Sequence, residues 1–121
     1  MNYKDILATL TIIVDTREKS WQNIEDVFRE RGYNYRRQKL NAGDYSFEVS
    51  VGDKLVSFAD TIVIERKADL EECANCFGGD RERFKREFDR IKENDIDCVL
   101  IVENGSLFDI REHNYNSKLK P

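Results

Sequence analysis

The sequence lacks the features that mark membrane and secreted proteins. It has no run of about 18 apolar residues, the length that a membrane-spanning helix needs. Its N-terminus has no basic segment followed by an apolar stretch, so we expect no secretory signal. Repeats, low-complexity tracts and linkers are also missing, and we therefore expect one domain over residues 1–121.

Histidine and cysteine are scarce, with one and three residues. Cys73 and Cys76 could begin a zinc site or form a redox pair. The only further ligands of these types are Cys98 and His113, which make no matching pair, so a helix face containing Cys73 and Cys76 is the simpler interpretation. We expect His113 to be exposed. An odd number of cysteines without an export signal favours a reduced, cytoplasmic setting.

Positive charge is also in deficit. The 24 acidic residues outnumber the 20 basic ones, for a formal net charge of −4. A protein that coats nucleic acid without specificity would be basic overall, so this class is disfavoured. A protein that contacts nucleic acid through a local basic patch stays compatible with this balance, because local patches decide such contacts and carboxylates of a metal site would lower the net charge.

Hydrophobic periodicity and turn residues predict an alternating α/β order. Strands are expected at residues 10–14, 33–39, 45–51, 55–58, 61–64 and 98–102. Helices are expected at residues 22–31, from a cap at Asp69 to Cys76, and from a cap at Asp80 to about Glu93. The fold class is therefore α/β, with a central mixed β-sheet flanked by α-helices.

Acidic residues lie at the ends of three of the predicted strand segments. Asp15 comes directly after residues 10–14, Asp44 lies in the turn before residues 45–51, and Glu65 follows the β-branched run at residues 61–64. Because side chains alternate along a strand, Glu65 and Lys67 project to one side and Arg66 to the other. We expect these carboxylates to converge on a pocket that holds a divalent cation, as phosphodiester hydrolysis requires.

Each motif alone is weak evidence. Gly-Asp is a frequent turn, and a Glu-x-Lys cluster is common at solvated strand ends. Three strand ends that carry carboxylates are harder to obtain from an ordinary surface, and this convergence favours the interpretation as a site.

Taken in order, these motifs resemble the nuclease domain of the XPF family of structure-specific endonucleases. The family signature is Gly-Asp, a variable gap, Glu-Arg-Lys, three residues and Asp, and here it matches Gly43-Asp44 and Glu65-Arg66-Lys67. The last acidic position is occupied by Glu71, with Asp69 as an alternative at the wrong spacing. The similarity runs from Thr11 to about Glu103 and suggests a compact phage or prokaryotic version.

The resemblance implies a restriction-endonuclease-like fold and a Mg²⁺- or Mn²⁺-dependent endodeoxyribonuclease with roles in DNA repair and recombination. Its metal would be held by Asp44, Glu65 and the backbone carbonyl of Arg66. Asp15, and with it Glu18, would bind the metal through water or a second ion. Lys67 would orient the attacking water, Glu71 would be the last acidic residue, and Glu18 would support the site. Arg66 would either hold the site through a salt bridge or reach the DNA backbone. The expected products carry a 5′-phosphate and a 3′-hydroxyl.

Basic residues near these motifs are candidates for DNA contact. Arg36 and Arg37 follow tyrosines in residues 33–39, although a half-buried strand with core tyrosines is the favoured interpretation of those tyrosines. The other candidates are Arg17, Arg81 and Arg83.

The end of the chain departs from the resembled family. Members of that family usually add a helix-strand-helix after the last strand, and many carry a helix-hairpin-helix DNA-binding module; in residues 103–121 we expect neither. The chain is therefore expected to be a minimal nuclease or the N-terminal piece of a longer protein. Relatives also suggest a homodimer or a partner subunit. Two rival functions stay open: a non-catalytic subunit that binds branched DNA, and an acidic interaction module.

Overall fold

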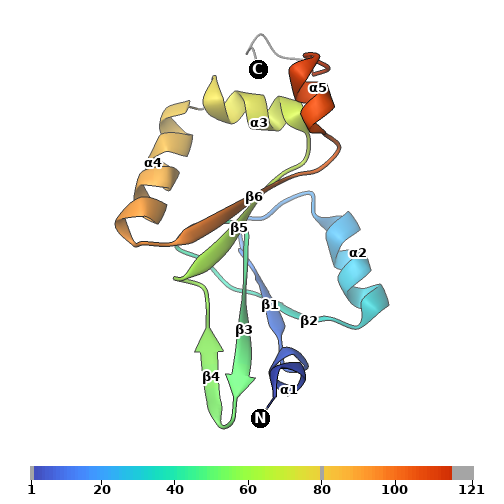
Figure 1. Ribbon diagram of the computed structural model, residues 1–121, viewed down its shortest axis with the longest axis vertical. Coiled ribbons are helices and arrows are strands. Elements are labelled where there is room, and N and C mark those ends of the chain that lie inside the picture. The colour runs from blue at the N-terminus through green and yellow to red at the C-terminus, as the bar shows by residue number, and fades with distance from the viewer. Residues whose placement is uncertain (1, 80, 116–121) are drawn as a thin grey trace.

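A computed structural model describes residues 2–79 and 81–115. The strands are β1 (Thr11–Val14), β2 (Asn34–Arg37), β3 (Tyr45–Val51), β4 (Lys54–Ser57), β5 (Ile62–Lys67) and β6 (Asp97–Val102). The helices are α1 (Tyr3–Leu7), α2 (Gln22–Arg31), α3 (Leu70–Phe77), α4 (Arg81–Glu93) and α5 (Leu107–Arg111) (Figure 1). No helix in this described part is long and apolar enough to cross a membrane.

The strands form one mixed sheet in the order β2-β1-β3-β5-β6, with β4 paired to β3. β1 is parallel to β2, and β5 is parallel to β6. Between these pairs, β3 runs antiparallel to both β1 and β5. The predicted α/β class with a central mixed sheet flanked by helices is confirmed.

The two faces of the sheet pack against different helices. Val14 of β1 and Ile64 of β5 join a cluster with Ile24 and Phe28 of α2. Val63, the neighbour of Ile64, instead packs with Ile91 of α4. Successive strand residues point to opposite faces, so α2 and α4 cover opposite sides of the sheet (Figure 1).

Local signals account for most element boundaries. Gly32 ends α2 in the left-handed conformation with φ 69°, and the Asp69 carboxylate accepts the Glu72 N–H at the start of α3, as predicted. Asp80, the predicted cap of α4, lies outside the described residues, as do residues 116–121 of the C-terminal tail. His113 is exposed, as predicted.

Two helices were missed by the sequence analysis. α1 and α5 have five residues each and no buried side chain. Each begins with a side-chain cap: Asn2 accepts the Asp5 N–H, and Ser106 accepts the Asp109 N–H. Such short helices carry too little periodicity to be recognised from sequence, and their caps were the only available signal.

A glycine substitution tests how tightly the turn before β3 is packed. Gly43 has φ +80°, and a Cβ there would lie 2.6 Å from Val63 Cβ; Gly52 has φ +63° and no atom within 4 Å of that position. We expect Gly52→Ala to lower the free energy of unfolding by about 1 to 2 kcal/mol, and Gly43→Ala by about 2 to 4 kcal/mol because overpacking is added. Urea denaturation of both variants measures this, and equal losses would contradict the close packing.

Candidate active site

The sheet topology brings the three predicted acidic motifs together at one end of the central strands β1, β3 and β5. Val14 at the end of β1 pairs with Tyr45 at the start of β3, and Tyr45 pairs with Ile64 near the end of β5. Asp44 joins the two neighbours through its backbone. The Asp15 N–H donates to the Asp44 carbonyl at 2.8 Å, and the Asp44 N–H donates to the Ile64 carbonyl at 2.8 Å.

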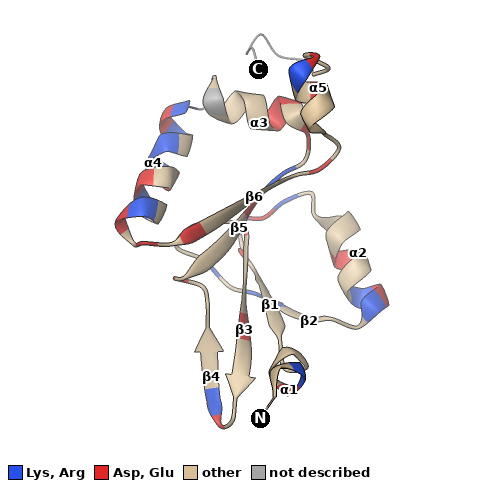
Figure 2. Ribbon diagram, in the orientation of Figure 1, with Lys and Arg blue, Asp and Glu red and all other residues tan. Residues whose placement is uncertain are grey.

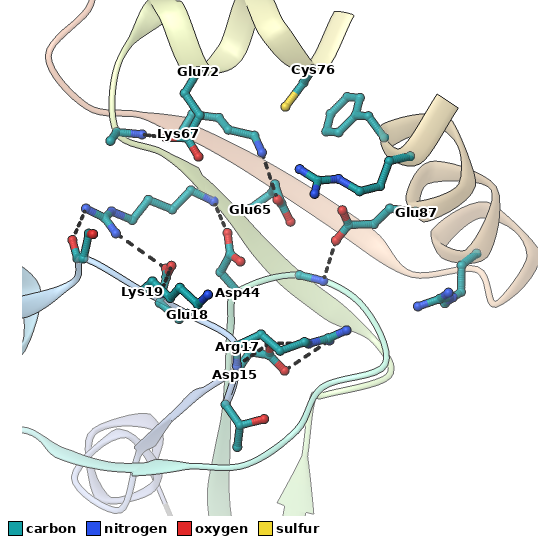
Figure 3. Close-up of a pocket in the computed structure, with 18 of the residues that line it drawn as sticks. Asp15, Arg17, Glu18, Lys19, Asp44, Glu65, Lys67, Glu72, Cys76 and Glu87 are labelled. Carbon is teal, nitrogen blue, oxygen red and sulfur yellow. Dashed lines mark hydrogen bonds and ion pairs between the residues drawn. The ribbon is translucent and has the colours of Figure 1, made fainter. Parts of the chain in front are cut away.

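A pocket of about 1040 Å³ opens at this end of the strands, between the loop after β1, the turn before β3, and helices α3 and α4 (Figure 3). Its acidic lining residues are Asp15, Glu18, Asp44, Glu65, Glu72 and Glu87. Its basic lining residues are Arg17, Lys19, Arg66, Lys67, Arg83, Arg86 and Arg90. Within the described residues, no group of three or more His, Cys, Asp or Glu is arranged to hold a metal ion by itself.

Asp44, Glu65 and Lys67 lie together, as predicted. Glu65 and Lys67 point to the same side of β5, with Lys67 Nζ 3.3 Å from Glu65 Oε1. Glu65 is only 7% exposed, and its Oε2 is buried with no hydrogen-bond partner among the described residues. The Asp44 carboxylate accepts the Arg66 N–H at 2.7 Å. The buried Glu65 oxygen is therefore left for a ligand. Glu18 Oε2, the other buried carboxylate oxygen without a hydrogen bond among the described residues, lies 3.7 Å from the Arg66 guanidinium.

Burial makes both carboxylates hard to ionise. It raises the pKa of Asp44 to about 6, although the Arg66 N–H opposes the shift. Burial also raises the pKa of Glu65 to about 8, and the negative charges of Asp44 and Glu87 add to the effect. A divalent cation between these groups would stabilise their ionised forms, so the two carboxylates fit a metal site.

Lys67 remains positively charged in this setting. Burial opposes its charge, but contacts with Cys76 and Glu65 outweigh burial and raise its pKa. Its ammonium also lies 5.4 Å from the centre of the Phe84 ring, a distance suited to a cation–π contact. Lys67 is thus a fixed cation beside Glu65.

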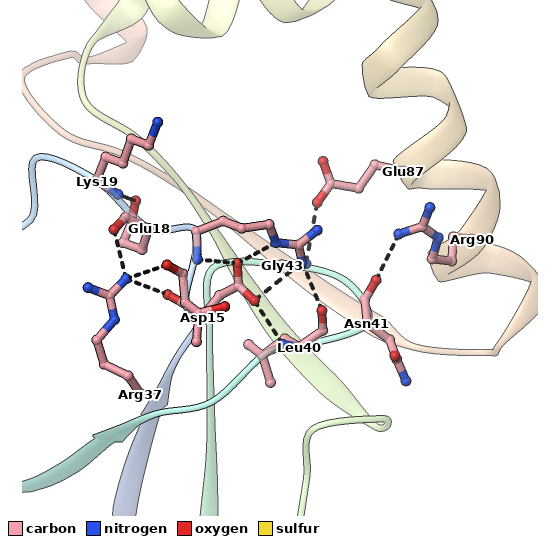
Figure 4. Close-up of polar contacts among 11 residues, drawn as sticks. Asp15, Glu18, Lys19, Arg37, Leu40, Asn41, Gly43, Glu87 and Arg90 are labelled. Carbon is pink, nitrogen blue, oxygen red and sulfur yellow. Dashed lines mark hydrogen bonds and ion pairs between the residues drawn. The ribbon is translucent and has the colours of Figure 1, made fainter.

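Asp15 has a different environment from the other two carboxylates. Its oxygens accept hydrogen bonds from Arg17 Nε at 2.8 Å, the Arg17 N–H at 3.1 Å and the Leu40 N–H at 2.8 Å (Figure 4). Burial raises its pKa, but these bonds outweigh burial and leave the pKa below its usual value. The structure therefore places Asp15 at the pocket, with hydrogen-bond donors already at both of its oxygens.

Arg66 projects away from Glu65 and forms ion pairs. Its guanidinium contacts Glu103, lies 3.7 Å from Glu18, and donates to the Ser20 carbonyl at 3.1 Å. The sequence left open whether Arg66 makes a salt bridge or reaches DNA, and the structure shows the salt bridge. Glu18 lies beside the site, where its charge also raises the pKa of Asp44.

Arg36 and Arg37 do not line the pocket. Arg36 pairs with the buried Glu48 of β3, and its Nη2 lies 2.7 Å from Glu48 Oε2. Arg37 donates to the carbonyls of the loop after β1, at 3.0 Å for Asp15 and 2.9 Å for Glu18 (Figure 4). Both arginines are thus engaged within the protein. Tyr35 packs in the α2 cluster, as the alternative interpretation of this strand predicted, whereas Tyr33 is 46% exposed and is not part of that cluster.

Helices α3 and α4 present residues that the motif analysis did not select. Glu72, rather than the predicted Glu71, lines the pocket from α3, while its carboxylate also accepts the Ala68 N–H at 2.8 Å. Arg83 lines the pocket as expected, and Arg81 does not. The additional lining residues of α4 are Arg86, Glu87 and Arg90. With Arg83 they follow helical spacing, a signal that was present in the sequence but resembled ordinary surface ion pairing.

The family model of the ERCC4 domain matches residues 14–121, which include all of these motifs. The chain belongs to the ERCC4 domain family. This confirms the predicted XPF-family resemblance and places the chain in a structure-specific nuclease family that acts on DNA, in which divalent metal ions are generally used.

Among solved structures, XPF from Aeropyrum pernix is similar, with 15% sequence identity and a TM-score of 0.38. The similarity covers 77% of this chain and 54% of that one, so the chain spans about half of that relative's length. No curated protein sequence matches the chain.

The raised pKa values predict an unusual dependence of stability on pH. Between about pH 4 and pH 8, the unfolded chain loses protons from Asp44 and Glu65 that the metal-free folded chain keeps. The free energy of unfolding should therefore fall as pH rises through this range. The double variant Asp44→Asn/Glu65→Gln should remove about 1 to 3 kcal/mol of that fall, as measured by urea denaturation in EDTA.

Glu48→Gln is the control for this experiment. The Arg36 ion pair holds the pKa of Glu48 below its usual value, so its contribution is present above that value and is lost only in acid. The free energy of unfolding of this variant should therefore fall between pH 5 and pH 8 as much as that of the wild type. An equally steep fall in the double variant would show that Asp44 and Glu65 do not retain their protons.

Proposed function

We propose that the chain is the nuclease domain of a divalent-cation-dependent endonuclease that hydrolyses phosphodiester bonds in branched or otherwise structured DNA. One observation carries the proposal. The unpartnered Oε2 of Glu65 is buried in the pocket, in the same site as the Asp44 carboxylate and the Lys67 ammonium. A buried carboxylate oxygen without a partner is costly, and a bound cation would satisfy it.

The donor atoms suit Mg²⁺ or Mn²⁺. Both are hard cations that bind carboxylate and carbonyl oxygens, and Mg²⁺ often uses one or two carboxylates together with water and substrate phosphate. In our proposal Asp44 and Glu65 are the protein carboxylates and the Arg66 carbonyl is a further ligand. Asp15 contributes by fixing the loop after β1 and the Leu40 segment beside Asp44, since its oxygens already accept hydrogen bonds.

A cation bound there would polarise the phosphate and lower the pKa of the attacking water. The chain's own contribution is positional and electrostatic. Lys67, held between Glu65 and Phe84, would orient the attacking water and stabilise negative charge that develops on the phosphate. Arg66 acts indirectly, because its ion pairs to Glu18 and Glu103 fix the end of β5.

Basic side chains on two walls of the pocket would position the DNA backbone. Arg17 and Lys19 come from the loop after β1, and Arg83, Arg86 and Arg90 come from α4, where basic and acidic residues alternate (Figure 2). Contacts to phosphates position a nucleic acid without reading its sequence. This suits an enzyme that selects DNA by its shape.

A non-catalytic subunit that binds branched DNA is the second candidate. Family membership and the cationic walls are compatible with it. The buried carboxylates favour the nuclease, because a binding subunit gains nothing from ionisable groups that burial makes hard to charge.

Cleavage of labelled branched, single-stranded and duplex DNA tests the proposal. We expect cutting with Mg²⁺ or Mn²⁺, none with EDTA, and a loss of at least about 100-fold in rate for Asp44→Asn, as for removal of one electrostatic group from an active site. The matched control is Asp53→Asn, which alters an exposed Gly-Asp turn in the β3–β4 hairpin. Binding to branched DNA without any cleavage would favour the non-catalytic subunit.

Substitution of the arginines tests the DNA path. In the Asp44→Asn background, Arg86→Ala should weaken binding to branched DNA and reduce the salt dependence by about one phosphate contact. Arg36→Ala should leave affinity unchanged, because Arg36 pairs with Glu48 away from the pocket. Fluorescence anisotropy over a series of salt concentrations measures both. If Arg36→Ala lost as much affinity for branched DNA as Arg86→Ala, residues 33–39 would be part of the DNA interface.

A further inference from the structure

Helix α4 holds the turn that carries Asp44 at two points. Arg90 Nη1 donates to the Asn41 carbonyl at 3.0 Å, and Glu87 Oε1 accepts the Gly43 N–H at 3.3 Å (Figure 4). The turn also packs closely against β5, because a Cβ at Gly43 would lie 2.6 Å from Val63 Cβ. The position of the Glu87 carboxylate relative to the Gly43–Asp44 backbone is therefore well defined.

We propose that Glu87, held in place by the Gly43 N–H, is a positioning residue beside the cation site, and that its negative charge strengthens cation binding by Asp44 and Glu65. This inference rests on the proposed function. It assigns Glu87 a role in positioning the cation and does not require Glu87 to be a direct ligand.

The surroundings of Glu87 support this assignment. Figure 3 shows the side chain directed from α4 into the pocket, toward Glu65. Glu65 and Glu87 also line a second, smaller cavity together with Phe84 and Leu100, so apolar groups border both carboxylates. The negative charge of Glu87 raises the pKa of both Asp44 and Glu65. A charge that disfavours ionisation of both groups in the metal-free protein will favour a divalent cation beside them.

The buried oxygen of Glu65 provides independent evidence for a ligand at this point. Its Oε2 has no hydrogen-bond partner within residues 2–79 and 81–115, and the Glu65 side chain is 9% exposed. Glu87 thus adds charge to a site that already contains an unsatisfied oxygen.

Glu87→Gln tests the charge without changing the size of the side chain, and its amide oxygen can still accept the Gly43 N–H. Calorimetric titration of the whole chain with Mn²⁺ at pH 8 should give a dissociation constant about tenfold higher than that of the wild type, as for other residues that surround metal ligands. The free energy of unfolding in EDTA should stay equal or rise, because repulsion is removed. A merely structural role predicts the opposite change in stability.

Glu82→Gln is the matched control, since Glu82 is an exposed residue of α4 that does not line the pocket. It should bind Mn²⁺ as tightly as the wild type. The inference is overturned if Glu87→Gln binds within about twofold of the wild type, or if Glu82→Gln loses as much affinity. Absence of Mn²⁺ binding by the wild type would instead overturn the proposed function, so the two failures can be distinguished.

Discussion

The position of the Asp44 backbone between β1 and β5 is the constraint on which the site depends. Its carbonyl accepts the Asp15 N–H and its N–H donates to Ile64, so one residue connects the edges of two strands. These bonds follow from β3 running antiparallel to both neighbours, which brings the start of β3 to the ends of β1 and β5. The carboxylates converge because of backbone pairing, and the side chains themselves repel one another. The sheet therefore supplies the free energy that keeps like charges together.

That repulsion shapes the chemistry of the pocket. Glu65 is buried and Asp44 is half-buried, so ionisation of both is disfavoured, while Lys67 stays charged beside them. A surface cluster would relax by turning its side chains into water. Here the packing of α4 against Val63 on one face, and of α2 against Ile64 on the other, prevents such relaxation. Holding these carboxylates together lowers the local stability of the fold, as is expected at functional sites.

Several parts of this site were predictable from sequence, because they depend on short-range patterns. Strand alternation alone predicts that Glu65 and Lys67 share a side and that Arg66 faces the other, and the structure agrees. The roles of Arg36 and Arg37 depend on which groups the fold brings near them. Glu48 lies in another strand, and the carbonyls that Arg37 binds come from a loop about twenty residues earlier. Pairings at that distance leave no trace in local sequence.

The contrast between Asp15 and Glu65 shows why residue type alone cannot assign a role. Both are acidic residues at strand ends and both are buried, yet hydrogen-bond donors surround Asp15 and lower its pKa, whereas Glu65 keeps one oxygen unpartnered and its pKa is raised. A carboxylate whose bonds are complete stabilises the metal-free fold, and one whose bonds are incomplete is stabilised only by a ligand. The opposite pKa shifts of these two pocket carboxylates therefore distinguish Asp15, whose hydrogen bonds support the loop after β1, from Glu65, which keeps an oxygen without a partner.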